Sequence, residues 1–246
     1  MTLLKDFKMI TEIKLKNFKI FEDEKFEIAP LTLFTGINGM GKSSVIQSLL
    51  LLKQSFKSNK LFNESLVELD NESFINLENC EELCNKKADP KIVGVGIEIS
   101  HEERFEWLID ASNPNNESAK VEFKGSSDGI LSSSLFKETF IYLSAERYGP
   151  RKSYGRVNKL KRYNTDLGIQ GELTPAYIQR AVSRNEEVGI DALIHSTLKG
   201  LPKSEQESSK LLYNNINAWL GDILGRSAIA NVSDIDKENV KLTFSL

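Results

Sequence analysis

The 246-residue sequence has little of what marks a membrane protein, a secreted protein or a metal site. Its most apolar segment, Ser48–Leu52, falls far short of the roughly 18 residues that a membrane-spanning helix needs. The N-terminus lacks the apolar stretch and small-residue cleavage site of a secretory signal. Only two cysteines are present, Cys80 and Cys84. They are too few for a disulfide framework, and their spacing, with no histidine nearby, fits neither a zinc site nor a redox pair. We therefore expect a cytoplasmic protein with plain thiols.

The sequence also lacks an excess of charge of one sign. The formal net charge is −3 and the pI about 5.7, so the surface as a whole does not indicate nucleic-acid binding, although a local basic patch still could. Hydrophobic residues make up 40% and charged residues 27%, which is ordinary for a globular protein. The length suits one large α/β domain or two small ones.

The first 35 residues have the pattern of short strands. Residues 10–16 alternate between apolar and polar with one slip, and residues 25–28 alternate again. A hairpin joined by the charged segment 22–24 is the simplest interpretation. Pro30 ends this element, and the apolar residues 31–35 predict a further short strand.

Directly after that segment, residues 36–43 read Gly-Ile-Asn-Gly-Met-Gly-Lys-Ser, which fits G-x-x-x-x-G-K-[ST] at every fixed position. The glycines allow a tight turn whose N–H groups point inward as an anion nest. Lys42 would contact the β- and γ-phosphates and Ser43 would ligate Mg²⁺. Residues 44–56 contain no Gly or Pro and predict a helix whose N-terminus faces the phosphates. The pattern predicts a nucleoside triphosphate site, with ATP and Mg²⁺ as the expected ligands.

Three segments near the N-terminus resemble a known family. The run 13–19, the segment 31–34 and the loop 36–44 are similar to the N-terminus of ABC-type ATPases of the RecF, SMC and Rad50 kind. The Asn38-Gly39 pair and the double serine Ser43-Ser44 are typical of that branch. More narrowly, the sequence resembles bacterial AAA ATPases of the DUF3696 group, related to the OLD family; the segments behind this are 47–54, 142–147, 149–151, 171–174 and 217–220.

The resemblance implies a P-loop NTPase of ABC-ATPase type, an α/β fold with a mixed sheet, an antiparallel β layer and a helical insertion. It places the N-terminal part of the core at 1–165, with an acidic insert at about 61–85, the insertion at 166–230 and a strand re-entering the core at 231–246. It also places Asn17, Phe18 and Lys19 beside the adenine. The alternative is that Phe18 belongs to the core and Lys19 to the solvated surface. The expected nucleotide-binding set is Gly36, Asn38, Gly39, Gly41, Lys42, Ser43 and Ser44, with Asn17, Phe18, Lys19 and Arg147.

Two motifs of such ATPases are missing. Neither an apolar strand ending in Asp-Glu, which would hold the Mg²⁺ shell and activate water, nor a glycine-containing signature segment occurs in the sequence. Residues 140–143 predict a buried strand, but Ser-Ala-Glu follows it. We interpret the chain as the N-terminal half of a longer or split ATPase, which hydrolyses ATP poorly by itself. By analogy with the Q-loop of the family, Ser144 or Glu146 would then take the metal side and Arg147 a phosphate; the alternative is a structural ion pair between Glu146 and Arg147.

The middle of the chain carries two segments of opposite charge. Residues 61–85 hold seven acidic residues and no Lys or Arg, which is typical of a solvated face. Residues 147–163 hold seven basic side chains, all within Arg147–Arg162, with tyrosines interleaved and no acid. This stretch could bind a phosphate backbone, the ATP phosphates or an acidic partner surface.

The remaining segments predict ordinary elements. Short strands are expected at 92–99, 105–109 and 121–123, and 126–134 reads as a loop. Helices are expected at 174–183, 190–198 and 204–224, the last ended by Gly225. His195, a single histidine in an apolar segment, is expected to be structural.

Three functions remain open at this stage. The leading one is an ATPase module that closes into a homodimer around ATP, with a C-terminal half or separate chain completing the site, and controls an effector such as a nuclease, in anti-phage defence or DNA transactions. That role rests on the resemblance alone. The alternatives are a regulatory subunit that senses ATP without hydrolysing it and a DNA-repair clamp of the RecF type.

Overall fold

The computed structural model describes residues 9–70, 74–137, 140–146, 149, 151–155, 167–188, 194–200 and 202–245. They divide into two compact units that meet in the sequence between Phe140 and Ile141. We call them the N-terminal unit and the C-terminal unit and describe each by itself. No helix in these residues is long and apolar enough to cross a membrane.

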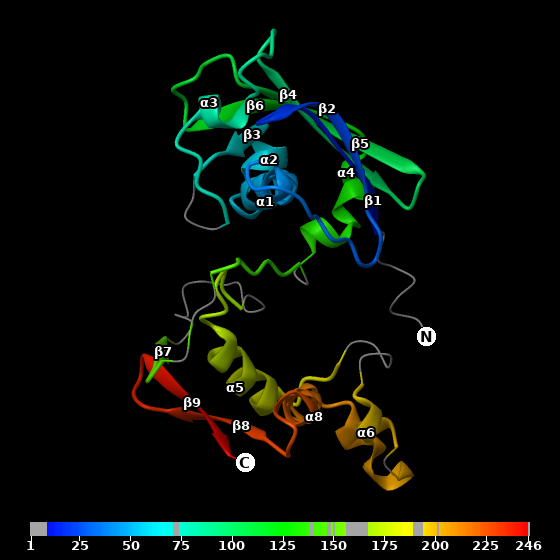
Figure 1. The fold of residues 1–246 in the computed structure, drawn as a ribbon, viewed down its shortest axis with the longest axis vertical. Coiled ribbons are helices and arrows are strands. Elements are labelled where there is room, and N and C mark those ends of the chain that lie inside the picture. The colour runs from blue at the N-terminus through cyan, green and yellow to red at the C-terminus, as the bar shows by residue number, and fades with distance from the viewer. Residues whose placement is uncertain are drawn as a thin grey trace. The chain divides into compact units, whose positions relative to one another are not determined.

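The N-terminal unit is built on a six-stranded antiparallel sheet in the order β2-β1-β4-β5-β6-β3 (Figure 1). The strands are β1 (Ile10–Phe18), β2 (Phe21–Glu27), β3 (Leu66–Glu68), β4 (Ile92–Ile99), β5 (Glu103–Asp110) and β6 (Ser118–Lys124). The helices are α1 (Lys42–Lys57), α2 (Lys60–Asn63), α3 (Cys80–Leu83) and α4 (Ser127–Leu131), followed by the 3-10 turn η1 (Ser134–Phe136). The predicted strands at 92–99, 105–109 and 121–123 and the antiparallel layer are confirmed.

The N-terminal hairpin is confirmed with a different turn. Phe18 pairs with Phe21, so the chain reverses at Lys19 and Ile20, and the charged segment 22–24 lies within β2. A run of charged residues indicates a turn in the sequence, but here it belongs to β2, an edge strand that presents polar side chains to solvent.

Two predicted strands are wrong. Residues 31–35 form no strand, and Leu31 and Leu33 are 89% and 81% exposed. Residues 140–143 also form no strand, and Ile141 is exposed. Both segments have strand-like composition but no strand pairs with them among the described residues. All strand pairs in this part of the chain are antiparallel, so the expected mixed sheet is not seen there.

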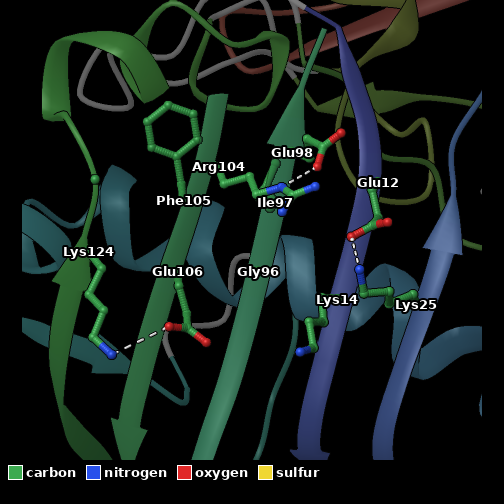
Figure 2. A pocket seen from close by; sticks show the side chains of 11 residues that line it. Glu12, Lys14, Lys25, Gly96, Ile97, Glu98, Arg104, Phe105, Glu106 and Lys124 are labelled. Carbon is green, nitrogen blue, oxygen red and sulfur yellow. Dashed lines mark hydrogen bonds and ion pairs between the residues drawn. The ribbon is translucent and has the colours of Figure 1, made fainter. Parts of the chain in front are cut away.

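The two faces of the sheet carry different kinds of side chain. Ile13, Leu15, Val95, Ile97 and Trp107 are buried on the face that packs toward α1. The opposite face carries cross-strand ion pairs (Figure 2): Lys25 with Glu12 at 3.2 Å, Arg104 with Glu98 at 2.6 Å and Lys124 with Glu106 at 3.5 Å. This alternation is the pattern of an antiparallel sheet with one solvated face.

Helix α1 is enclosed in its second half. Its residues 50–55 are all buried, because the sheet covers one side and the segment 61–77 covers the other. Leu61, Val67, Leu69, Ile75 and Leu77 of that segment are buried. The acidic segment is therefore part of the core as well as a solvated face. The expected loop 126–134 likewise contains α4 and the start of η1.

The polar residues of the enclosed half of α1 bond to the surrounding main chain. Gln54, fully buried, donates to the carbonyl oxygens of Glu68 (2.7 Å) and Leu69 (3.2 Å) and accepts from the N–H of Ile75 (3.1 Å). Ser55 accepts from the N–H of Glu68 at 2.9 Å. These bonds hold the main chain of Glu68, Leu69 and Ile75 on α1.

The two cysteines, Cys80 and Cys84, are free and buried, as expected for plain thiols. Burial raises the pKa of both thiols; the charges of Asp110 and Cys84 add to the rise at Cys80, and Lys91 opposes it at Cys84. The neutral thiol is thereby favoured in both positions.

The C-terminal unit contains a three-stranded antiparallel sheet in the order β7-β9-β8 and several helices (Figure 1). Its elements are β7 (Tyr154–Gly155), α5 (Thr174–Arg184), α6 (Ser196–Lys199), η3 (Lys203–Glu205), α7 (Gln206–Ser209), α8 (Leu212–Leu224), β8 (Ile229–Asp234) and β9 (Asn239–Ser245). The helix at 174–183 and the end of α8 at Gly225 are confirmed. The predicted helix 204–224 is broken into three pieces. Of the predicted helix 190–198, residues 196–198 are helical as part of α6, and residues 190–193 lie outside the described residues.

Replacing Gln54 with Leu tests the main-chain bonds to α1. The backbone groups of Glu68, Leu69 and Ile75 would each lose the bond to Gln54, although the carbonyl of Leu69 keeps the N–H of Leu77. We therefore expect the free energy of unfolding to fall by about 3 kcal/mol. Urea denaturation measures it. The control is Gln179→Leu, which removes only an exposed bond to Asp234 and should cost less than about 1 kcal/mol. Equal losses in the two variants would contradict the assignment.

Candidate nucleotide-binding site

The segment 36–43 forms a loop whose backbone requires glycine at three positions. Gly36, Gly39 and Gly41 have φ angles of 140°, 85° and 80°. Residues with a side chain rarely adopt such angles. The fixed glycines of the motif therefore serve the conformation of the loop.

Helix α1 begins at Lys42, directly after Gly41, with its N-terminus open. No side chain caps this end and no acidic residue lies in its first turn. The first N–H groups of a helix have no partner within the helix, and they carry the positive end of the helix dipole. The end of α1 thus offers uncompensated donors where an anion can bind.

The ammonium of Lys42 lies within the loop. Its Nζ donates to the carbonyl oxygens of Gly36 and Ile37, each at 2.8 Å. Lys42 therefore spans the loop from the first residue of the helix to the first residue of the motif. These carbonyls hold the charge at the place where phosphate oxygens would replace them.

The hydroxyl of Ser43 is exposed at the start of the helix, and Ser44 is partly exposed beside it. Asn38 is exposed in the loop. Ser43 fits a single Mg²⁺ ligand whose remaining ligands come from phosphate and water. No group of three His, Cys, Asp or Glu side chains suited to a metal ion occurs in the described part of the chain.

The turn of the β1–β2 hairpin packs on the loop. A Cβ on Gly41 would lie 2.5 Å from Cζ of Phe21 and 2.7 Å from Cδ1 of Ile20. Sequence reasoning missed both contacts, since nothing in the local pattern links residues 20 and 21 to residue 41. Gly41 is thus required by packing as well as by its φ angle.

The three residues expected beside the adenine have separate environments. Phe18 is fully buried in the core, so its ring is not available to a base. Asn17 donates from Nδ2 to the carbonyl oxygen of Ile92 at 3.0 Å and joins β1 to β4. Lys19 is partly buried, and its Nζ donates to Oε1 of Gln47 on α1 at 2.8 Å. Burial lowers the pKa of Lys19, and the carboxylate of Glu82 opposes that shift. Of the three, Lys19 alone has a polar group next to α1.

The other expected site residues, Ser144, Glu146 and Arg147, follow Ile141 in the sequence of the C-terminal unit. Glu146 is exposed, and its carbonyl oxygen accepts from the hydroxyl of Ser144 at 2.7 Å. Arg147 lies outside the described residues, as does most of the basic stretch. The roles of Glu146, Arg147 and the basic stretch stay predictions.

His195 caps a short helix in the C-terminal unit. It is 2% exposed; its Nδ1 accepts from the N–H of Thr197 at 3.3 Å, and its Nε2 lies 2.9 Å from Oδ2 of Asp222 on α8. The residue lines an open cleft of about 890 Å³. Its contacts tie α6 to α8, which favours the structural role.

A trough of about 440 Å³ lies on the solvated face of the main sheet over Gly96 (Figure 2). The glutamates that line it are Glu12, Glu98 and Glu106, and each pairs with a basic side chain of the same face. Its charges are balanced within the face, unlike those of the 36–43 loop.

The loop, the open helix end and Lys42 together form a candidate phosphate-binding site. A family model described as an AAA ATPase domain matches residues 9–242, and the chain belongs to that family. No curated protein and no solved structure matches the chain. Membership of an ATPase family supports nucleotide binding, usually with Mg²⁺.

Two glycines of the loop can be compared by substitution. Gly39→Ala should cost about 1 kcal/mol of stability, because its φ is positive but no atom lies within 4 Å of the added Cβ. Gly41→Ala should cost at least about 2 kcal/mol, because the Cβ also collides with Ile20 and Phe21. Thermal unfolding of the two variants gives the difference. Equal costs would show that the hairpin does not pack on the loop.

Proposed function

We propose that this chain is the nucleotide-binding module of an ABC-type ATPase of the RecF branch, and that it binds ATP with Mg²⁺ at residues 36–44. The observation that carries the proposal is the uncapped N-terminus of α1, which opens onto a loop with three glycines at positive φ. Lys42 supplies a charge inside that loop. Family membership supports the same ligand class.

Each residue of the site has one role in this proposal. The backbone N–H groups of the loop and of the first turn of α1 bind the phosphates, and Lys42 moves from the carbonyls of Gly36 and Ile37 to the phosphate oxygens. Ser43 ligates the Mg²⁺ that the nucleotide brings. Lys19, held by Gln47, is the polar group of the hairpin turn that remains for the base or ribose.

Hydrolysis needs groups that this sequence does not supply. The apolar-Asp-Glu strand and the signature segment are missing from the sequence. The segment before the loop also leaves Leu31 and Leu33 exposed, which is costly for apolar side chains and favours a further strand pairing with it. We infer that a C-terminal half or separate chain completes the core, that two such modules close around ATP, and that the dimer controls an effector. A role in anti-phage defence or DNA transactions is the part that rests only on family resemblance.

Nucleotide binding and turnover of the unmodified chain and Lys42→Ala test the proposal. Loss of a charged hydrogen-bond donor should weaken Mg·ATP binding about 10- to 100-fold in calorimetry. Turnover should be negligible in both proteins, because the sequence lacks the apolar-Asp-Glu strand whose carboxylate would activate water.

The control is Lys120→Ala, an exposed lysine on β6, which should bind like the unmodified chain. Equal binding by Lys42→Ala and the control would overturn the site. Robust turnover that Lys42→Ala abolishes would show that a water-activating acid is present, and Glu146 would be the first to examine. Binding without turnover, even with added partner chains, would favour the ATP-sensing subunit.

A further inference from the structure

The enclosed end of α1 contacts the segment that leads out of the N-terminal unit. This unit ends at Phe140, and the C-terminal unit begins at Ile141. Lys137 and Phe140 follow η1 and lie against α1. The helix that begins at the phosphate loop therefore also contacts the last residue of the N-terminal unit.

Lys53 makes the polar part of this contact. Its side chain is 3% exposed, and its Nζ donates to the carbonyl oxygen of Lys137 at 2.8 Å. The same carbonyl accepts from the N–H of Phe140 at 3.3 Å. One oxygen thus receives both the ammonium from α1 and the amide of the last residue before the join.

Aromatic rings make the rest of the contact. Nζ of Lys53 lies 5.3 Å from the centroid of the Phe140 ring, and that ring lies 6.3 Å from the ring of Phe74. Lys57, one turn further along α1, has its Nζ 4.6 Å from the Phe74 centroid. Cations at such distances from aromatic rings attract them, more strongly when water is excluded. Phe140 is thereby fixed between a cation and a second ring.

The burial of the Lys53 ammonium is unfavourable by itself. Taking a charge out of water costs free energy, and a well-packed apolar residue often serves stability equally well. Unlike an apolar side chain, the ammonium needs a hydrogen-bond acceptor in a fixed position. For Lys53 that acceptor is the carbonyl oxygen of Lys137, close to the end of the N-terminal unit.

Helix α1 links this contact to the phosphate loop. Lys42 is its first residue and Lys53 lies 11 residues further on, a distance of about 16 Å along the axis. Because Leu50–Ser55 are buried on all sides, a change at the open end is passed along a helix that has little freedom to bend separately. We propose that Lys53 and Phe140 form a clamp through which nucleotide at the phosphate loop fixes the join between the units. Lys53 is a positioning residue in this clamp, and the coupling rests on the proposed nucleotide site.

Amide hydrogen exchange of the full chain, followed at Phe140 by NMR, tests the clamp in two arms. Without nucleotide, the Phe140 amide of Lys53→Met should exchange at least about tenfold faster than that of the unmodified chain. The reason is that the bond from the Lys53 ammonium to the Lys137 carbonyl is lost. With saturating Mg·ADP, the unmodified chain should slow this exchange at least about threefold. Lys53→Met should show no such slowing, while its affinity for Mg·ADP stays within about threefold.

The control is Lys124→Met, which removes an ion pair on the solvated face of the sheet and should behave like the unmodified chain in both arms. If Lys53→Met does not fold, Phe140→Leu removes the ring and keeps the lysine, and the same loss of nucleotide-dependent slowing is expected. Unchanged exchange in the first arm overturns the clamp. Normal binding with no slowing in the unmodified chain, or equal slowing in the variant, overturns the coupling. If the chain does not bind Mg·ADP, the proposed function fails and the coupling fails with it. The first arm uses no nucleotide and still decides whether the clamp exists.

Discussion

The N-terminal unit depends on the unequal environment of the two ends of α1. The second half of the helix is enclosed by the sheet and by residues 61–77, and its polar side chains bond to the main chain around it. Its first residue stands at the open loop, without a cap or an acid nearby. The enclosed half fixes the direction of the helix. The N–H donors at its open N-terminus are therefore held in place to bind an anion.

The segment before the loop shows the opposite situation. Residues 31–33 alternate between leucine and threonine, as a strand would, yet both leucines are almost fully exposed. Among the described residues no strand pairs with this segment, which supports the proposal that another segment of polypeptide completes the core. The glycines and Lys42 are in place independently of it, which separates the ability to bind nucleotide from the ability to hydrolyse it.

Local patterns predicted much of the fold and the centre of the site. The alternation at 10–16 and 92–99 indicated strands, and the run after Gly41 without Gly or Pro indicated α1. Contacts between distant segments could not be read in this way. The sequence alone indicates that Lys53 and Gln54 lie on the solvated face of a helix. In the structure both are buried, through contacts with residues far along the chain such as Leu69, Ile75 and Lys137. Phe18 has the same composition signal whether it stacks on a base or fills a core, and burial alone decides between the two.

Backbone NMR of the isotope-labelled chain during titration with Mg·ADP locates the nucleotide site. The largest shifts should fall on the amides of residues 36–44, because the loop and the first turn of α1 supply the phosphate donors. Smaller shifts should reach Lys19 and Gln47, which are joined beside α1. Saturable shifts centred on another surface, with residues 36–44 unaffected, would contradict this assignment of the site.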